Sequence, residues 1–327
     1  MALVDQESLF TPFKPKKYQS GDPSKGLIQG YQSSTLTAPR TPSSYANPEA
    51  RGVNEAADGG LPAPATPSYS PPSNFDPDYQ ALLNYANTQG YTLPTDAQQF
   101  DQNYMVQQLK QFGIWNKLDL FYVFATDGDE DFATLNWKAP STFKLIPTNS
   151  PTFTSNIGFT GNGTDQYLDS EWAATSGSNF TANNASHGVF TNSHRGGNAT
   201  GNIGYHGQGG SGTYNFISYQ LSNFTNYSQL NGLSDSTQQN NFTSFRAVTF
   251  NSSLFKVWQG FKAFVTSKSG GNISDDPMRI MQRSVSGTEY YAPSSVEFKA
   301  DFWGSSLSDY EITNIITTVT GYIGKLS

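Results

Sequence analysis

The apolar residues of this chain first follow a regular spacing after residue 75. Asp76 and Pro77 are typical of a helix start, with the carboxylate at the N-cap and proline at the first helical position. Apolar residues then recur three and four positions apart, which predicts an amphipathic helix that Gly90 is suited to end. A second helix is predicted from Pro94 to Gly113. The residues expected to line its apolar face are Phe100, Tyr104, Leu109 and Phe112.

The following segment, Leu118–Ala125, is dense in aromatic and aliphatic residues and predicts a buried strand. From about residue 126 to residue 302, short β-rich runs alternate with clusters of Gly, Asn and Ser, which is typical of a sandwich or barrel. These runs are Gln166–Leu168, Gly188–Thr191, Tyr214–Tyr219, Phe245–Phe250, Phe261–Thr266, Arg279–Met281 and Val296–Phe302. The aromatic residues expected in the core are Phe153, Phe159, Tyr167, Phe190, Phe216, Phe250, Phe264, Phe298 and Trp303.

The chain ends with the pattern of a capped helix. Ser308 and Glu311 have the spacing of a capping box, in which each side chain binds an amide that the helix leaves unpaired. Behind them an apolar face is expected at Ile312, Ile315, Ile316 and Val319. A single helix with such a face must pack on another surface, so we expect it to dock on the sandwich.

The first 74 residues differ, because they hold 11 of the 18 prolines of the chain without a regular apolar spacing. Each proline fixes its own φ and removes a hydrogen-bond donor, so this segment cannot bury enough surface to offset the entropy lost on ordering. We therefore expect an extended arm that becomes ordered by lying on other chains. The residues expected to anchor it are Phe10, Phe13, Tyr18, Leu27, Ile28, Tyr31 and Tyr45.

Composition narrows the function classes further. Charged residues make up only 14% of the chain, and 26 acidic residues against 19 basic ones give a net charge of −7. This composition lacks the basic footprint of a nucleic-acid-binding protein. The absence of cysteine excludes disulfides, thiolate metal sites and cysteine nucleophiles. The N-terminal residues lack the pattern of a signal peptide and no apolar stretch is long enough to span a bilayer, so we expect no membrane insertion.

Two segments resemble a known family. The segment Gly158–Asp169 is similar to the opening strand–turn–strand of laminin-G-like, concanavalin-A-like jelly rolls, and Val296–Ile312 resembles the last strand and helix of that family. The motifs Gly113–Asp119, Ala125–Asp129 and Ala133–Lys138 resemble a version found in structural proteins of tailed bacteriophages. The resemblance covers roughly residues 76–327 and implies an oligomeric virion component, such as a head fibre, a tail fibre or an adaptor.

Because concanavalin-A-like folds include glycosidases, carboxylate pairs are the first chemistry to examine. Those enzymes require two carboxyl groups roughly 5–10 Å apart. The glutamates available in the sandwich, Glu171, Glu289 and Glu297, form no cluster in the sequence. Glu297 and Asp301 share a face of a predicted strand, but four residues along a strand separate them by roughly 13 Å. The sequence therefore predicts that the protein is not an enzyme.

Metal and phosphate sites are also disfavoured. The acidic residues Asp127, Asp129 and Asp131 could hold Ca²⁺, but an Asp-Gly turn that leaves a strand is the preferred interpretation. The histidines His187, His194 and His206 lack metal-ligand spacing and are expected to be polar loop residues. The glycine-rich segment Gly196–Gly212 has no lysine and no helix start after it, so it is expected to be a loop or an edge hairpin. We expect no metal and no cofactor.

Four aromatic residues lie in expected loops, namely Trp172, Tyr205, Tyr290 and Tyr291. Their rings suit stacking on sugars, but the preferred interpretation is that they cover the ends of the sandwich or lie at contacts between subunits. The sequence as a whole predicts a mainly β protein with a C-terminal jelly-roll sandwich and a capped terminal helix. Its expected parts are an anchoring arm (residues 1–75), a helical hairpin with a linking strand as a stem (76–150) and the sandwich (151–327).

The function predicted from these observations is that of a structural protein of a tailed-phage virion, in a head or tail fibre or appendage. Its expected partners are capsid, portal or tail subunits, reached through residues 1–75, and sister copies in a dimer or trimer. Two alternatives remain open: a receptor-binding lectin that recognises a host surface glycan, and, less favoured, a secreted carbohydrate-active enzyme.

Overall fold

The computed structural model describes residues 75–192, 202–208, 215–220, 225–238, 244–273, 275–285, 288–292 and 294–326. Residues 1–74 of the predicted anchoring arm, with all seven of its anchoring residues, lie outside these ranges, as does His194. None of the helices in the described ranges is long and apolar enough to cross a membrane.

The elements of the described residues are four α-helices, two 3-10 turns and seventeen strands. The helical elements are α1 (Pro77–Gln89), α2 (Asp96–Gln111), η1 (Trp115–Lys117), α3 (Glu130–Ala133), η2 (Ala174–Ser176) and α4 (Asp309–Ile323). The strands are β1 (Leu118–Val123), β2 (Ile146–Thr148), β3 (Thr152–Thr154), β4 (Gly158–Thr160), β5 (Tyr167–Ala173), β6 (Asn184–Thr191), β7 (Asn202–Gln208), β8 (Asn215–Gln220), β9 (Thr225–Leu230), β10 (Leu233–Gln238), β11 (Phe245–Asn251), β12 (Leu254–Gln259), β13 (Lys262–Ser267), β14 (Pro277–Ile280), β15 (Gln282–Val285), β16 (Thr288–Tyr291) and β17 (Phe298–Gly304).

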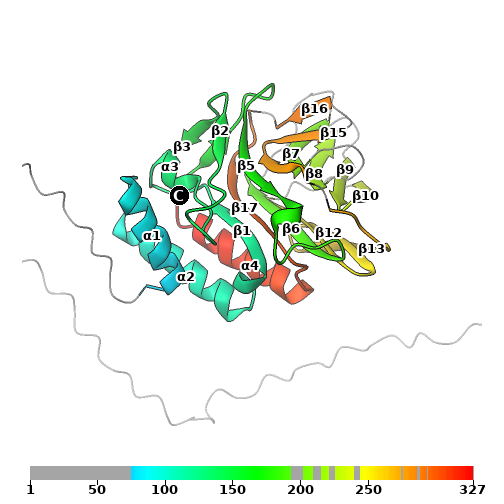
Figure 1. The fold of residues 1–327 in the computed structure, drawn as a ribbon, viewed down its shortest axis with the longest axis horizontal. Helices are drawn as coiled ribbons and strands as arrows, with labels where there is room; N and C mark the ends of the chain where they lie inside the picture. The colour runs from blue at the N-terminus through cyan, green and yellow to red at the C-terminus, as the bar shows by residue number, and fades with distance from the viewer. Residues whose placement is uncertain are drawn as a thin grey trace, which may run out of the picture. The chain divides into compact units, whose positions relative to one another are not determined.

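Two antiparallel sheets form the body of the fold (Figure 1). The first has the order β13-β12-β11-β6-β17-β4-β3, and β1 also pairs with β17. The second has the order β10-β9-β8-β7-β14-β5-β2, and β15 and β16 form a separate hairpin beside β7. The prediction of a mainly β fold with an antiparallel sandwich, a preceding helical hairpin and a capped terminal helix is confirmed.

The core between the two sheets is built around large aromatic side chains. Trp172 on β5, Phe180 and Trp303 on β17 are each at most 1% exposed, and their ring centroids lie 5.6–5.8 Å apart. The predicted core residues that are buried in this cluster are Phe159, Phe250, Phe298 and Trp303. Phe153 and Phe264 are only partly buried against it, and the side chain of Phe216 lies outside what the structure describes.

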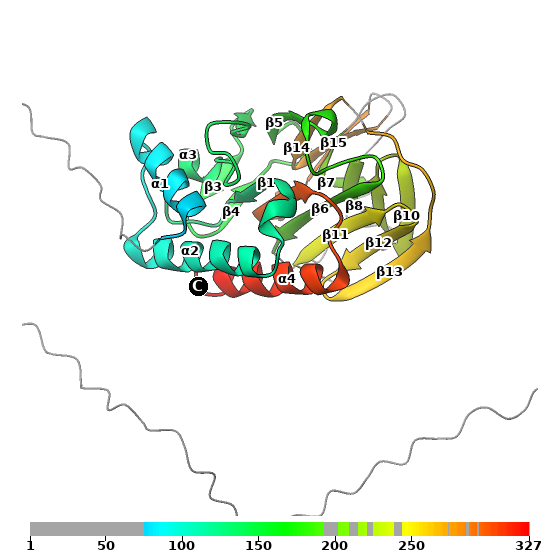
Figure 2. The ribbon, with the colours of Figure 1, turned by 60° about the horizontal axis from the view of Figure 1, so that its bottom comes forward.

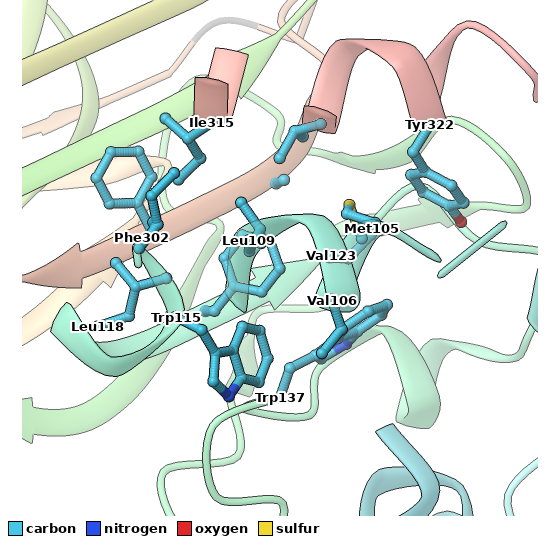
Figure 3. Packing of buried hydrophobic residues seen from close by; sticks show 14 of the residues in the cluster. Met105, Val106, Leu109, Trp115, Leu118, Val123, Trp137, Phe302, Ile315 and Tyr322 are labelled. Carbon is cyan, nitrogen blue, oxygen red and sulfur yellow. The ribbon is translucent and has the colours of Figure 1, made fainter. Parts of the chain in front are cut away.

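A second apolar cluster lies on the outer side of the first sheet, between this sheet and the helices. Figure 2 shows α2 and α4 side by side beneath this sheet. In Figure 3, Leu109 of α2 lies on the side of Phe302 of β17 and Ile315 of α4, and Met105 of α2 lies beside Tyr322 of α4. Phe190 belongs to this cluster and is buried there, rather than between the sheets. The predicted docking of the C-terminal helix on the sandwich is therefore confirmed.

The helix boundaries follow the predicted capping residues. Asp76 accepts a hydrogen bond from the Asp78 amide at 2.9 Å, and Gly90 ends α1 with a φ of 78°, in the left-handed region. Ser308 and Glu311 form the predicted capping box at the start of α4. Lys117 adds an ion pair to Glu311 at 2.7 Å, which ties the start of α4 to η1.

The predicted apolar face of α2 is wrong in part. Phe100 and Tyr104 are each 55% exposed, whereas Gln102 is fully buried. The amide of Gln102 accepts from the Tyr79 hydroxyl at 2.7 Å and donates to the Tyr322 hydroxyl at 2.8 Å. Because these hydrogen bonds satisfy the buried amide, α2 can turn a glutamine-rich face toward α1 and α4.

The helical hairpin is also not a separate layer. β1 pairs along β17 in the first sheet and β2 pairs with β5 in the second. Residues from α1, α2, β17 and α4 share one apolar cluster. The boundary that the sequence predicts at residue 150 therefore has no counterpart in the packing of the described residues, which form a single compact unit from residue 75 onward.

The glycine-rich segment Gly196–Gly212, which was predicted to be a loop or an edge hairpin, contains a strand. Residues 202–208 form β7, which lies inside the second sheet between β8 and β14 rather than in a loop or at an edge. β7 pairs with both neighbours through its backbone, so its glycines do not prevent a strand, although the register with β8 shifts between Gly204 and His206. The rest of the segment lies outside the described residues.

Candidate functional site

The aromatic residues chosen from the sequence do not come together at one loop cluster. Trp172 is 1% exposed in β5 and packs between the sheets, so its prediction as a loop residue open to a sugar or a subunit is wrong. Tyr205 lies on β7 and Tyr290 on β16, in strands and not in loops, and their side chains lie outside what the structure describes. Tyr291, the last residue of β16, is half-buried and belongs to the cluster described next.

Strand alternation places a set of polar and aromatic side chains on the outward face of the second sheet. On β5, Leu168 points into the core, so its neighbours Tyr167 and Asp169 point outward and are only half-buried. Arg279 on β14 stands directly opposite Asp169, and Ile146 on β2 stands opposite Asp169 on the other side. These three residues therefore form one row across β2, β5 and β14.

Arg279 is the centre of the cluster. Its Nε lies 2.9 Å from Oδ2 of Asp169, and Nη1 donates to Oε1 of Gln282 at 3.2 Å. The guanidinium also lies over the ring of Tyr167, with its carbon 4.8 Å from the ring centroid. Oε1 of Glu289 is 3.9 Å from Nη1. The sheet, the aromatic ring and the two carboxylates thus hold the guanidinium in a fixed plane.

Tyr291 completes the cluster from the β15–β16 hairpin. Its ring centroid lies 6.4 Å from that of Tyr167, and its hydroxyl donates to the carboxylate of Glu289. Burial, and then the hydrogen bond and the negative charge of Glu289, raise the pKa of Tyr291 to about 12. The phenol is therefore protonated at neutral pH. We call the group formed by Tyr167, Asp169, Arg279, Glu289 and Tyr291 the tyrosine–arginine cluster.

A shallow hollow of about 380 Å³ adjoins the cluster. It is lined by residues 143–147 and by Glu171. Ile146, which is 47% exposed, pairs with Asp169 and so places the hollow next to the cluster on β5. Lys144 at the rim is already paired with Asp131 at 2.5 Å and with the hydroxyl of Tyr91 at 3.0 Å.

This arrangement offers the contacts that a polyhydroxylated ring requires. Aromatic faces and an exposed isoleucine provide apolar surface, while carboxylate and guanidinium groups accept and donate hydrogen bonds in fixed directions. Asp169 and Arg279 were not among the site residues predicted from the sequence, and Tyr167 was predicted to lie in the core. The signal that could have found them is the alternation itself, since Leu168 and Ile280 mark the inward positions and leave Asp169 and Arg279 outside.

The acidic loop has structural roles. Asp127 accepts from the amide and the hydroxyl of Thr95, at 3.0 and 2.6 Å. Asp129 caps α3 by accepting from the Phe132 amide at 2.8 Å. With Asp131 paired to Lys144, all three carboxylates have partners, which agrees with the turn interpretation. Within the described ranges, no group of three or more His, Asp or Glu side chains could hold a metal ion.

Three other residues behave differently from the predictions. His187 is not in a loop, because it is fully buried on β6 with its ring stacked on Trp303 at 4.4 Å. Asp301 is fully buried on β17, and burial raises its pKa well above the ordinary value. Glu297 lies outside β17 and is 3.3 Å from the ammonium of Lys299. Asp301 and Glu297 therefore do not line a common cleft.

No protein-family model matches the chain, and no curated protein sequence matches it either. Among solved structures, it is similar to a mutant Trypanosoma rangeli sialidase that displays trans-sialidase activity, with a TM-score of 0.46 and 11% identity over 68% of this chain and 39% of that one. It is also similar to the botulinum neurotoxin serotype D binding domain (TM-score 0.42, 12% identity, 65% of this chain, 52% of that one). A third similar structure is the botulinum neurotoxin serotype G binding domain, with a TM-score of 0.44 and 9% identity over 61% of this chain and 50% of that one. The chain thus spans about two fifths to one half of these proteins, and likeness at this level does not indicate what it binds.

Proposed function

We propose that the sandwich binds carbohydrate through the tyrosine–arginine cluster. The observation that carries this proposal is the fixed position of Arg279 over the ring of Tyr167, next to the half-buried ring of Tyr291. Because the sheet and the hairpin already hold these groups in place, a sugar that contacts them would bind without the entropy cost of ordering several side chains. The adjacent hollow provides room for a second sugar unit.

Binding fits the cluster better than hydrolysis does. Glycoside hydrolysis needs one carboxyl group that carries a proton for the leaving group, whereas both carboxylates of the cluster lie within ion-pair distance of the Arg279 guanidinium, Asp169 at 2.9 Å and Glu289 at 3.9 Å. This supports the lectin alternative over the carbohydrate-active enzyme.

A glycan array followed by calorimetry with the full chain tests the proposal. We expect Tyr291→Ala to weaken binding of the selected glycan about tenfold or more, because it removes an aromatic face and the partner of Glu289. Tyr310→Ala is the matched control, since Tyr310 is 64% exposed on α4, outside the cluster. A blank array, or equal losses in the two variants, would contradict the assignment.

We further propose that this binding module is displayed by a tailed-phage virion, as a homo-oligomeric component of a head or tail fibre. The support for this context is the resemblance of the motifs Gly113–Asp119, Ala125–Asp129 and Ala133–Lys138 to structural proteins of tailed bacteriophages, together with the proline-rich residues 1–75 as the attachment arm to capsid, portal or tail subunits. Mass spectrometry of purified particles would detect the protein. Deletion of residues 2–60 should abolish its incorporation, and normal copy number in the deletion variant would refute the anchoring role.

A further inference from the structure

We infer that the tyrosine–arginine cluster selects uncharged sugars and rejects sugars that carry a carboxylate, such as sialic or uronic acids. This inference rests on the proposed function, because it names the ligand class of the same site. It follows from how the charges of the site are already paired.

The cation of the cluster is committed to protein carboxylates. Arg279 lies 2.9 Å from Asp169 and 3.9 Å from Glu289, so two negative charges face one positive charge. The side chain of Arg279 is 27% exposed and that of Asp169 is 17% exposed, so solvent only partly screens this pair. A ligand carboxylate would have to displace Asp169 from the guanidinium and would leave that half-buried aspartate without its partner.

The surroundings add more negative charge at the ligand position. Glu171 lines the adjoining hollow, and Lys144 at its rim is bonded to Asp131 and Tyr91. The ammonium of Lys144 also lies 4.5 Å from the centroid of the Tyr91 ring. Among the charged side chains that the structure describes in the cluster and the hollow, both cations are therefore already paired.

The same groups are well suited to neutral hydroxyls. Carboxylates only accept hydrogen bonds, and the exposed Glu289 has acceptor capacity beyond the bond from Tyr291. Two neighbouring hydroxyls of a sugar could donate to Glu289 and Asp169 while the ring packs on Tyr167 or Tyr291. An uncharged pyranose gains these bonds and meets no electrostatic penalty.

The test compares pairs of oligosaccharides that share a neutral core and differ only in a terminal sialic or glucuronic acid. With the full chain at low salt, we expect the neutral member of each pair to bind at least tenfold more tightly. Affinity for the neutral member should not change between low and high salt, since no ion pair forms. For Glu289→Gln, the ratio between the neutral and acidic members should fall at least threefold, because one of the two carboxylates loses its charge.

Glu297→Gln is the matched control. Glu297 is paired with Lys299 outside the cluster, so this variant should keep the ratio of the unmodified protein. Equal or tighter binding of the acidic members would overturn the inference and leave the proposed function standing. Binding restricted to cationic amino sugars would also overturn it. If no glycan of either kind binds, the proposed function fails, and the inference fails with it.

Discussion

Asp119 provides a sharp test of how the linking strand β1 is joined to the sandwich. Its carboxylate accepts hydrogen bonds from the amide of Ser178 at 3.1 Å, from the amide of Asn179 at 3.0 Å and from the amide of Phe180 at 2.7 Å. The Ser178 hydroxyl and the Asn179 side-chain amide each add a bond at 3.1 Å. The carboxylate is thus enclosed by one loop. Gly177 is required there, since a Cβ at that position would lie 2.8 Å from Oδ2 of Asp119.

Asp119→Ala removes the acceptor from this loop. Solvent reaches Ser178, so we count only the amides of Asn179 and Phe180, which lie in half-buried surroundings. A buried donor left without an acceptor costs roughly 1–3 kcal/mol. Water can approach Asn179, so we use the lower part of that range for each of the two donors. The expected loss in the free energy of unfolding is then about 2–4 kcal/mol.

Thermal and urea unfolding followed by circular dichroism measure this loss. For a body of this size, a loss of about 2–4 kcal/mol lowers the Tm by roughly 4–16 °C. Asp165→Asn is the control, because Asp165 is exposed and accepts from Asn162 at 2.7 Å, and it should change stability by less than about 0.5 kcal/mol. If the Tm of Asp119→Ala stays within about 1 °C of the unmodified protein, the loop does not depend on the carboxylate and the reasoning is refuted.

Two further predictions concern buried polar groups. Gln102→Leu should lower the free energy of unfolding by about 2–4 kcal/mol, because in a buried site Tyr79 loses a hydrogen-bond acceptor and Tyr322 loses a donor. The control Tyr104→Leu, on the exposed side of α2, should have little effect on stability. Equal losses in the two variants would contradict the role of these buried hydrogen bonds. Asp301→Asn tests the buried acid. Burial raises the folded-state pKa of Asp301, so between about pH 4 and that raised pKa the folded chain holds a proton that the unfolded chain releases. Within this window, each pH unit should destabilise the unmodified protein by about 1.4 kcal/mol through this group. The asparagine variant lacks this loss, so urea unfolding from pH 4 to pH 7 should show its relative stability rising with pH, and parallel curves would show that Asp301 ionises normally.

Local signals were read correctly from the sequence because they depend on residues only a few positions apart. Asp76 with Pro77, and Ser308 with Glu311, place the starts of α1 and α4 through contacts within one helical turn. The spacing of β-rich runs predicted the antiparallel sandwich. The exposed aromatic face of α2 was not predictable in the same way. A glutamine is buried only where distant groups satisfy its amide, and for Gln102 these come from α1 and α4.

The sequence by itself therefore determined the order of the segments, the helix caps and the class of fold. The alternation along a strand indicates which residues share a face, but only the tertiary structure decided which strands are neighbours, and the candidate site depends on that pairing. Arg279 and Asp169 are 110 residues apart, and no local pattern predicts that β14 pairs with β5. Trp172 and Tyr291 illustrate the same limit. Both are aromatic residues near polar ones, but sheet packing buries Trp172 in the core and places Tyr291 beside Tyr167 in the tyrosine–arginine cluster.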